Sequence, residues 1–236
     1  MVKNHIKRLA APKTWPINRK KHIWVTRQSS GTHRIDQSLP MSLVLKEFLS
    51  YAKTTKETKQ ILSSGKIMVD GVVRKEHKFP VGLLDVLNVD GESYRVIMNT
   101  KGKLVLHPVK GEEANLKLRK IVRKQKVKKG KTQITCFDGY NKIIGKEKYG
   151  VSDTVVFDTK KNEVKEHLKF EKGAMVYITS GKQVGVMGTV EEVKPGEGFN
   201  PSKIMFKVGK ETFETLKDYA FVVGKGKALI SLPKDE

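Results

Sequence analysis

Cysteine and paired metal ligands are nearly absent from this sequence. Its single cysteine, Cys136, cannot form a disulfide within the chain, and no cysteine pair is available to begin a zinc site. The six histidines are scattered singly, without the i, i+4 spacing that places two ligands on one helix face. We therefore expect an intracellular protein that holds neither a metal nor a cofactor.

Long apolar runs are absent as well. No segment approaches the roughly 18 apolar residues of a membrane-spanning helix. Residues 1–34 are basic and contain no acid, but they lack the apolar stretch of a secretory signal. A mitochondrial transit peptide is the competing interpretation, and Pro12 and Pro16 argue against an amphipathic targeting helix. The sequence thus predicts a cytoplasmic protein that does not enter a membrane.

Aromatic residues make up only 7% of the chain and hydrophobic residues 38%. This composition supplies several compact cores, but little material for one deep core or a large apolar pocket. The 236 residues allow one large domain or two to three small ones. We expect a multi-domain, mainly β protein with a small α+β domain, and no small-molecule substrate.

Acidic residues are few relative to basic ones. Lys and Arg total 47 against 25 Asp and Glu, a formal net charge of +22. Such a chain repels itself unless a polyanion neutralises it, so nucleic acid is the expected partner. Only eight of the basic residues are arginine, and lysine meets phosphate as a point charge rather than as a planar fork. The balance favours backbone recognition over base reading.

Residues 1–39 form a basic N-terminal arm in which cations alternate with rings. Basic side chains can neutralise phosphates, and rings can stack on exposed bases. Both tryptophans of the chain lie here, which favours an RNA contact over the alternative of a solvated tail. The arm residues expected to contact RNA are Lys3, Lys7, Arg8, Lys13, Trp15, Arg19, Lys20, Lys21, Trp24, Arg27, His33 and Arg34.

Residues 40–95 predict two short helices on a small sheet. The first helix begins near Pro40 with Ser38 as a possible cap, and the second carries a capping box from Thr54 to Glu57. Asp70-Gly71 joins two β-prone runs and predicts a tight hairpin. We expect one positively charged groove that fits an RNA helix by shape. Its cations are Lys53, Lys56 and Lys59 on the helices and Arg74, Lys75 and Lys78 after the hairpin.

Residues 96–169 alternate short β-prone runs with turn signals, which predicts a β-rich central domain. Within it, the segment 115–131 contains no acid. It is typical of a basic hairpin lying along phosphates, and a solvated surface strand is the alternative. The hairpin residues expected to contact RNA are Lys117, Arg119, Lys120, Arg123, Lys124, Lys126, Lys128 and Lys129.

Residues 170–236 show strand alternation punctuated by glycines, which is typical of a small SH3-like barrel. Glycine permits tight turns or a close approach of the backbone to a ligand. Here Gly181, Lys182, Gly185 and Gly188 are expected to present backbone and charge to RNA, and a plain turn is an equal alternative.

A set of residues spread along the chain forms a recognisable pattern by its order and spacing: those of 5–12, Gly31, His33, 38–40, Tyr51, Ala52, Glu57, Ile61, Gly65, 69–71, Val73, Arg74, 79–82, Asp85 and Val86. On these residues the chain as a whole resembles the S4e family of archaeal and eukaryotic small-subunit ribosomal proteins. It departs from the family pattern at Thr32, where proline is expected, and at Val72, where lysine is expected. The segment 173–193 separately looks like a KOW motif.

This resemblance implies a basic arm, an RNA-binding domain of the ribosomal S-four type, a β-rich central domain and a KOW barrel. It implies a structural constituent of the small ribosomal subunit that binds small-subunit ribosomal RNA and neighbouring ribosomal proteins. A catalytic role and a homo-oligomer are not expected.

Three alternatives stay open at this point. An RNA-modifying enzyme or a ribosome-assembly factor can carry the same RNA-binding domain, and a transcription or translation factor can carry the KOW barrel. An enzyme would need a pocket acid, and no such constellation is visible in the sequence.

Overall fold

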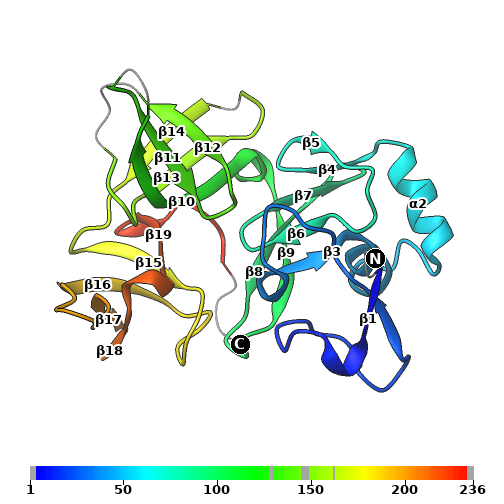
Figure 1. Ribbon diagram of the computed structural model, residues 1–236, viewed down its shortest axis with the longest axis horizontal. Helices are drawn as coiled ribbons and strands as arrows, with labels where there is room; N and C mark the ends of the chain where they lie inside the picture. The colour runs from blue at the N-terminus through cyan, green and yellow to red at the C-terminus, as the bar shows by residue number, and fades with distance from the viewer. Residues whose placement is uncertain (1–3, 128–129, 145–148, 162, 233–236) are drawn as a thin grey trace. The chain divides into compact units, whose positions relative to one another are not determined.

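The computed structural model describes residues 4–127, 130–144, 149–161 and 163–232 (Figure 1). The chain divides into two compact units. The N-terminal unit contains Met1–Met98 and Gly102–Asn115, and the C-terminal unit contains Asn99–Lys101 and Leu116–Glu236. Among the described residues α-helix is confined to α1 and α2, and β-strands dominate. The prediction of a mainly β chain with a small α+β part is confirmed.

The arm is folded in this structure. Strand β1 (His5–Lys7) pairs antiparallel with β2 (Trp24–Thr26). The 3-10 turn η1 (Arg8–Ala10) follows β1, and the 3-10 turn η2 (Ile35–Gln37) comes after β2. Trp15 is buried, and its indole Nε1 donates to the Ile35 carbonyl at 3.1 Å. The arm therefore packs as part of the N-terminal unit.

The two helices come next. Strand β3 (Ser38–Pro40) leads into α1 (Met41–Leu43), which continues as the π-turn η3 (Val44–Phe48). Helix α2 (Thr55–Ser63) begins at the predicted capping box, with Thr54 Oγ1 accepting from the Glu57 amide at 3.2 Å. The predicted Ser38 cap is wrong: Pro40 takes the cap position, and the Ser38 hydroxyl donates to the Arg34 carbonyl at 2.6 Å. Pairing of β3 with another strand holds Ser38 in extended backbone.

The sheet of the N-terminal unit has the order β5-β4-β7-β8-β9, and α2 lies beside it (Figure 1). The predicted hairpin is confirmed, with Asp70 at φ 50° and Gly71 at φ 78°. Strand β7 starts at Val86, shortly after Leu84, which has a positive φ of 64°. The strands are β4 (Ile67–Val69), β5 (Val72–Val73), β7 (Val86–Val89), β8 (Glu92–Met98) and β9 (Leu104–Val109), and β6 (Pro80–Gly82) pairs with β3.

The first sheet of the C-terminal unit has the order β12-β11-β10-β13-β14. Ile121, Ile134 and Phe157 belong to its buried core cluster. The long strand β10 follows a 3-10 turn, η4 (Gly111–Asn115). The strands are β10 (Leu116–Lys126), β11 (Thr132–Cys136), β12 (Asn141–Ile144), β13 (Thr154–Asp158) and β14 (Glu163–Leu168).

The second sheet of this unit has the order β18-β17-β16-β15-β19-β20, all antiparallel. Its register shifts between Val190 and Glu192, which marks a β-bulge in β16. The predicted glycine-punctuated β unit is thus present. Its elements are β15 (Ala174–Ile178), β16 (Met187–Lys194), β17 (Lys203–Val208), β18 (Glu211–Leu216), η6 (Lys217–Tyr219), β19 (Ala220–Lys225) and β20 (Lys227–Ala228).

A buried polar cluster joins the end of the arm to the turn between β6 and β7. His33 Nε2 lies 2.9 Å from Asp85 Oδ1, and Asp85 Oδ2 accepts the Gly82 amide at 2.8 Å. The His33 ring packs against Gly82 so closely that a Cβ there would lie 2.1 Å from the ring. We call His33, Gly82 and Asp85 the arm lock. All three are among the residues that carry the family resemblance.

The arm lock predicts a double-mutant cycle. Gly82→Ala alone should lower the free energy of unfolding by about 1–3 kcal/mol, because the added methyl group has no room beside the His33 ring. In the His33→Ala background the same change should cost far less, because the ring that it meets is gone. Denaturant unfolding of the four chains measures the coupling. Equal costs in both backgrounds would contradict the packing described.

Candidate nucleic-acid interface

Three arm residues predicted to contact RNA are buried, and the structure corrects their role. Arg8 forms an ion pair with Glu47 and donates to the Asn18 carbonyl at 3.0 Å. Trp15 is 1% exposed, and its ring fills the core beneath the arm. The third is His33 of the arm lock. These side chains hold the arm in place and are not available to RNA.

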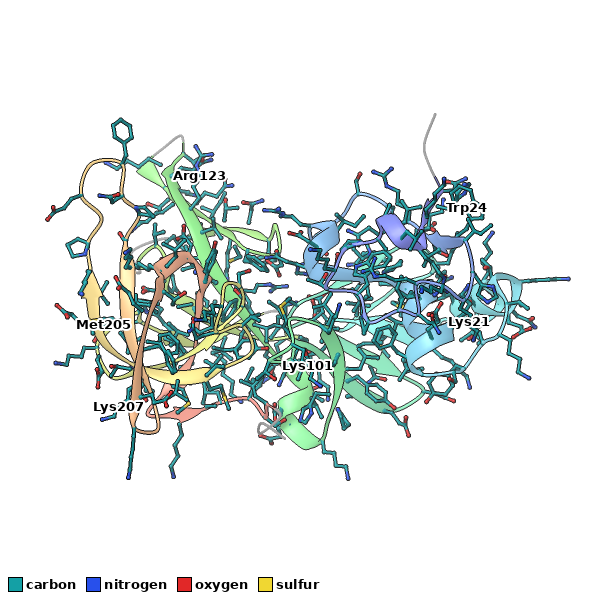
Figure 2. All side chains as sticks on the ribbon, turned by 90° about the horizontal axis from the view of Figure 1, so that it is seen from below. Lys21, Trp24, Lys101, Arg123, Met205 and Lys207 are labelled. Atoms are coloured by element: carbon teal, nitrogen blue, oxygen red, sulfur yellow. The ribbon has the colours of Figure 1, made fainter. Side chains whose placement is uncertain are left out.

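Arg19 is half-buried and also holds the arm together. Its guanidinium donates to the carbonyls of Arg8 at 3.0 Å, Ala11 at 2.9 Å and Pro12 at 2.8 Å. Lys3 lies outside the described residues. The predicted arm residues that remain exposed or partly exposed are Lys7, Lys13, Lys20, Lys21, Trp24, Arg27 and Arg34, of which Lys21 and Trp24 are labelled in Figure 2.

A groove of about 480 Å³ opens between the arm and the helices of the N-terminal unit. One side carries the rings of His5 and Trp24, whose centroids lie 4.6 Å apart at an interplanar angle of 73°. We call this the arm groove, and we define it by His5, Trp24, Lys46, Lys59, His77 and Lys78. The arm, η3, α2 and the segment before β6 all contribute to it.

The arm groove is electropositive. The pKa of His77 lies below its usual value, first because the ring is partly buried and further because Lys59, Lys78 and Lys46 act on it, while Glu76 opposes the shift. Lys78 Nζ donates to Asn4 Oδ1 at 2.6 Å, which directs this cation toward the arm. Three lysines from separate segments therefore act at one place.

The predicted cations of residues 40–95 separate into two groups. Lys59 and Lys78 line the arm groove, whereas Lys53, Lys56 and Lys75 are exposed outside it. Arg74 is half-buried, with its guanidinium 4.5 Å from the centroid of the Phe79 ring, and is held by that contact. Lys46 and His77 were missed by the sequence analysis. Lys46 lines a groove only because the arm packs beside it, so no local signal in the sequence could have found it.

Among the cations predicted on the basic hairpin, the exposed ones lie toward the far end of β10, where Arg123 is labelled in Figure 2. Arg123, Lys124 and Lys126 are exposed, and Lys124 Nζ donates to the Tyr149 carbonyl at 3.0 Å. Lys128 and Lys129 lie outside the described residues. Arg123 and Lys126 therefore remain the strongest candidates for phosphate contacts on this strand.

The beginning of β10 carries cations of a different kind, and three predictions are corrected there. Lys117 is 1% exposed and Lys120 6% exposed. Arg119 is largely buried, pairs with Asp138 at 2.6 Å, and stacks 4.1 Å from the centroid of the Tyr140 ring. These side chains point into the unit because both faces of β10 are covered at this level, so they are not surface contacts.

Lys120 ties β10 to the C-terminal part of the chain. Its ammonium donates to the carbonyls of Asp218 and Ala220 at 2.8 Å each and more weakly to that of Lys217 at 3.4 Å. Burial lowers the pKa of Lys120 to about 8, with a small opposing effect of Asp218 and a reinforcing one of Lys217. The amine thus loses its proton in the folded chain well before it does so in the unfolded chain.

This shift predicts a pH dependence. Below pH 8 the Lys120 amine is protonated in both the folded and the unfolded chain, and the folded chain bears the full cost of the buried charge. Between pH 8 and 10.5 the unfolded chain binds more protons than the folded chain, so the free energy of unfolding rises with pH. Relative to Lys120→Met, the free energy of unfolding of the native chain should rise by up to about 3 kcal/mol across this window. Denaturant unfolding at several pH values measures it, with the exposed Lys110→Met as control. An unchanged difference between native chain and Lys120→Met would contradict the shift.

The glycines predicted to approach RNA in the C-terminal unit are accounted for by packing. A Cβ at Gly188 would lie 2.6 Å from the Lys207 carbonyl oxygen, and one at Gly185 would lie 2.5 Å from the Asn99 carbonyl carbon. Gly181 has a φ of 94° in a turn beside Tyr219. Lys182 is exposed between them and is the cation that this turn offers.

Neither a group of metal ligands nor a membrane-spanning helix is found among the described residues. Within the described ranges, no group of three His, Cys, Asp or Glu side chains lies close enough together to hold a metal ion. No helix in that part of the chain is long and apolar enough to cross a membrane.

Comparison with known proteins gives a consistent result. The family model described as ribosomal family S4e matches residues 90–164, and the RS4NT domain matches residues 2–36. The small ribosomal subunit protein eS4 of Methanothermobacter thermautotrophicus is 38% identical over 98% of this chain and 96% of its own length. That of Archaeoglobus fulgidus is 41% identical over 95% of each chain. The crystal structure of the 30S ribosomal protein S4e from Thermoplasma acidophilum aligns with a TM-score of 0.71 at 33% identity, over 80% of this chain and 96% of that one.

Proposed function

The chain belongs to the ribosomal family S4e and is a structural constituent of the small ribosomal subunit, and on this premise we propose that two separate basic surfaces hold it on the subunit's RNA. The first surface is the arm groove together with Lys53, Lys56 and Lys75. The second is the outer part of β10 with Arg123 and Lys126. The alternatives of an RNA-modifying enzyme or a KOW-containing transcription factor are not favoured by the comparisons.

One observation carries the proposal: cations from segments far apart in the sequence converge in the N-terminal unit. Lys46, Lys59 and Lys78 all line the arm groove. A folded chain gathers like charges only at a cost, which a polyanion removes on binding. The surfaces consist mainly of lysine, so we expect them to follow phosphate positions and the shape of an RNA helix rather than to read base edges.

The family resemblance also supplies the expected turn, location and partners. The C-terminal unit contributes a KOW-type turn at Lys182. The chain is located in the cytoplasm, with the ribosome. Neighbouring proteins of the small subunit are the expected protein partners, with no homo-oligomer and no small-molecule substrate. The parts 1–39, 40–95, 96–169 and 170–236 are each proposed to contribute RNA contacts, the first two of them together through the arm groove.

The first surface gives a salt-dependence prediction. Changing Lys53 and Lys56 to Gln should weaken binding to a small-subunit rRNA transcript by about 10-fold and lower the slope of log K against log salt by about 1–2. The matched control changes Lys66 and Lys110, two exposed lysines of the same unit, to Gln. Filter binding at several salt concentrations measures both pairs. The proposal for this surface is lost if the two pairs behave alike.

The second surface gives a prediction about incorporation into the subunit. Arg123→Gln with Lys126→Gln should shift the chain from the small-subunit peak toward the top of a sucrose gradient when magnesium is lowered. Lys160→Gln with Lys165→Gln removes the same charge from an exposed part of the same unit and should leave the profile unchanged. Equal profiles for the two double variants would remove β10 from the RNA interface.

A further inference from the structure

We propose that the arm groove is a pocket for a single nucleotide turned out of the RNA stack, with its base against Trp24 and its phosphate on Lys46, Lys59 and Lys78. This inference rests on the proposed RNA-binding function and adds the class of RNA feature that is recognised. An RNA helix alone would meet the lysines of the groove and leave its aromatic rings unused.

The size of the groove suits one nucleotide. Its volume of about 480 Å³ falls within the range of roughly 300–1,000 Å³ in which proteins bind small ligands. A double helix cannot enter a space of this size. A bulged or looped-out nucleotide can, because unstacked bases are the part of RNA that proteins enclose in side-chain pockets.

The aromatic wall of the groove is fixed in position. Trp24 is 51% exposed, although it belongs to the paired strands β1 and β2. His5 meets it at 73° rather than lying flat on it, so the two rings do not cover each other by stacking. An exposed indole on a rigid strand pair loses little conformational freedom when a base stacks on it.

The elements of the groove outside the arm supply the positive charge for a phosphate. Lys46 lies on η3, Lys59 on α2 and Lys78 before β6, and all three act on the His77 ring between them. The carboxylates nearby do not cancel them fully, because Glu47 is paired with Arg8 and Glu76 is one negative charge against three lysines. Phosphate binding alone would not require the aromatic wall, and base stacking alone would not require three lysines. A nucleotide uses both.

The two walls are held against each other by direct contacts. The Thr26 and Ser42 hydroxyls lie 3.1 Å apart, which joins β2 to α1. The buried Arg8 pairs with Glu47 and so joins η1 to η3. The groove is therefore shaped before any ligand binds, and the cost of assembling it is paid by folding rather than by binding.

The chain itself supplies the probe for a test. It has two tryptophans, and Trp15 is buried, so quenching of indole fluorescence by a bound base reports on Trp24. Two RNA hairpins that differ by one unpaired nucleotide are titrated with the full chain. We expect the bulged hairpin to bind about 10-fold more tightly and to quench the fluorescence, and the unbulged hairpin to bind without quenching.

Variants separate this inference from the proposed function. Trp24→Leu should bring the ratio of the two affinities close to 1, and Trp24→Phe, which keeps a stacking ring, should restore most of the preference for the bulged hairpin. Lys53→Gln with Lys56→Gln should weaken both hairpins equally.

Three outcomes would overturn the nucleotide pocket. They are a bulge preference that survives Trp24→Leu, equal binding of the two hairpins by the native chain, and displacement of bound RNA with the same quenching by an acidic peptide of glutamate residues. In the first two cases the proposed function stands as long as both hairpins bind with the salt dependence of phosphate contacts. Failure of both hairpins to bind overturns the two proposals together.

Discussion

The buried carboxylate of Asp85 is the constraint on which the N-terminal unit depends. A carboxylate removed from water must have its hydrogen bonds supplied by the protein. Asp85 obtains them from the amide of Gly82, which is close in the sequence, and from the ring of His33, which lies 52 positions away. Satisfying one buried group therefore holds the end of the arm beside β6, which pairs with β3. The Thr26–Ser42 and Arg8–Glu47 contacts then hold the rest of the arm beside the helices, where the arm groove opens.

Cations in this chain do two kinds of work, which burial separates. Arg8, Arg95, Lys117 and Lys120 are buried, and Arg95 pairs with Glu113 much as Arg8 pairs with Glu47. Buried charges of this kind join elements because leaving one without partners would be costly. The net charge of +22 thus overstates the surface available to RNA, since part of it is enclosed within the fold.

Local features of the fold were readable from the sequence, and non-local ones were not. The Asp70-Gly71 hairpin and the Thr54 capping box depend on neighbouring residues, so both were predicted correctly. Lys117 and Lys120 were assigned to the surface because their segment contains no acid. Lys120 is held by carbonyls about 100 positions away, which no local pattern reports. Trp15 and the missed Lys46 are further cases, since the folding back of the arm determines the surroundings of both.

The hydrogen bond from Lys120 to the Ala220 carbonyl joins residues 100 positions apart. This separation sets an order of folding during synthesis. The N-terminal unit has all its strands and helices once residue 115 has left the exit tunnel. Lys120, on the strand β10 that follows, cannot bind the carbonyls of Asp218 and Ala220 until that part of the chain has been made. Because domains generally fold as units from the N-terminus during translation, the arm and its groove are complete while Lys120 on β10 still lacks the carbonyls that bind it. The chain can therefore present a finished RNA-binding surface before it is itself fully folded.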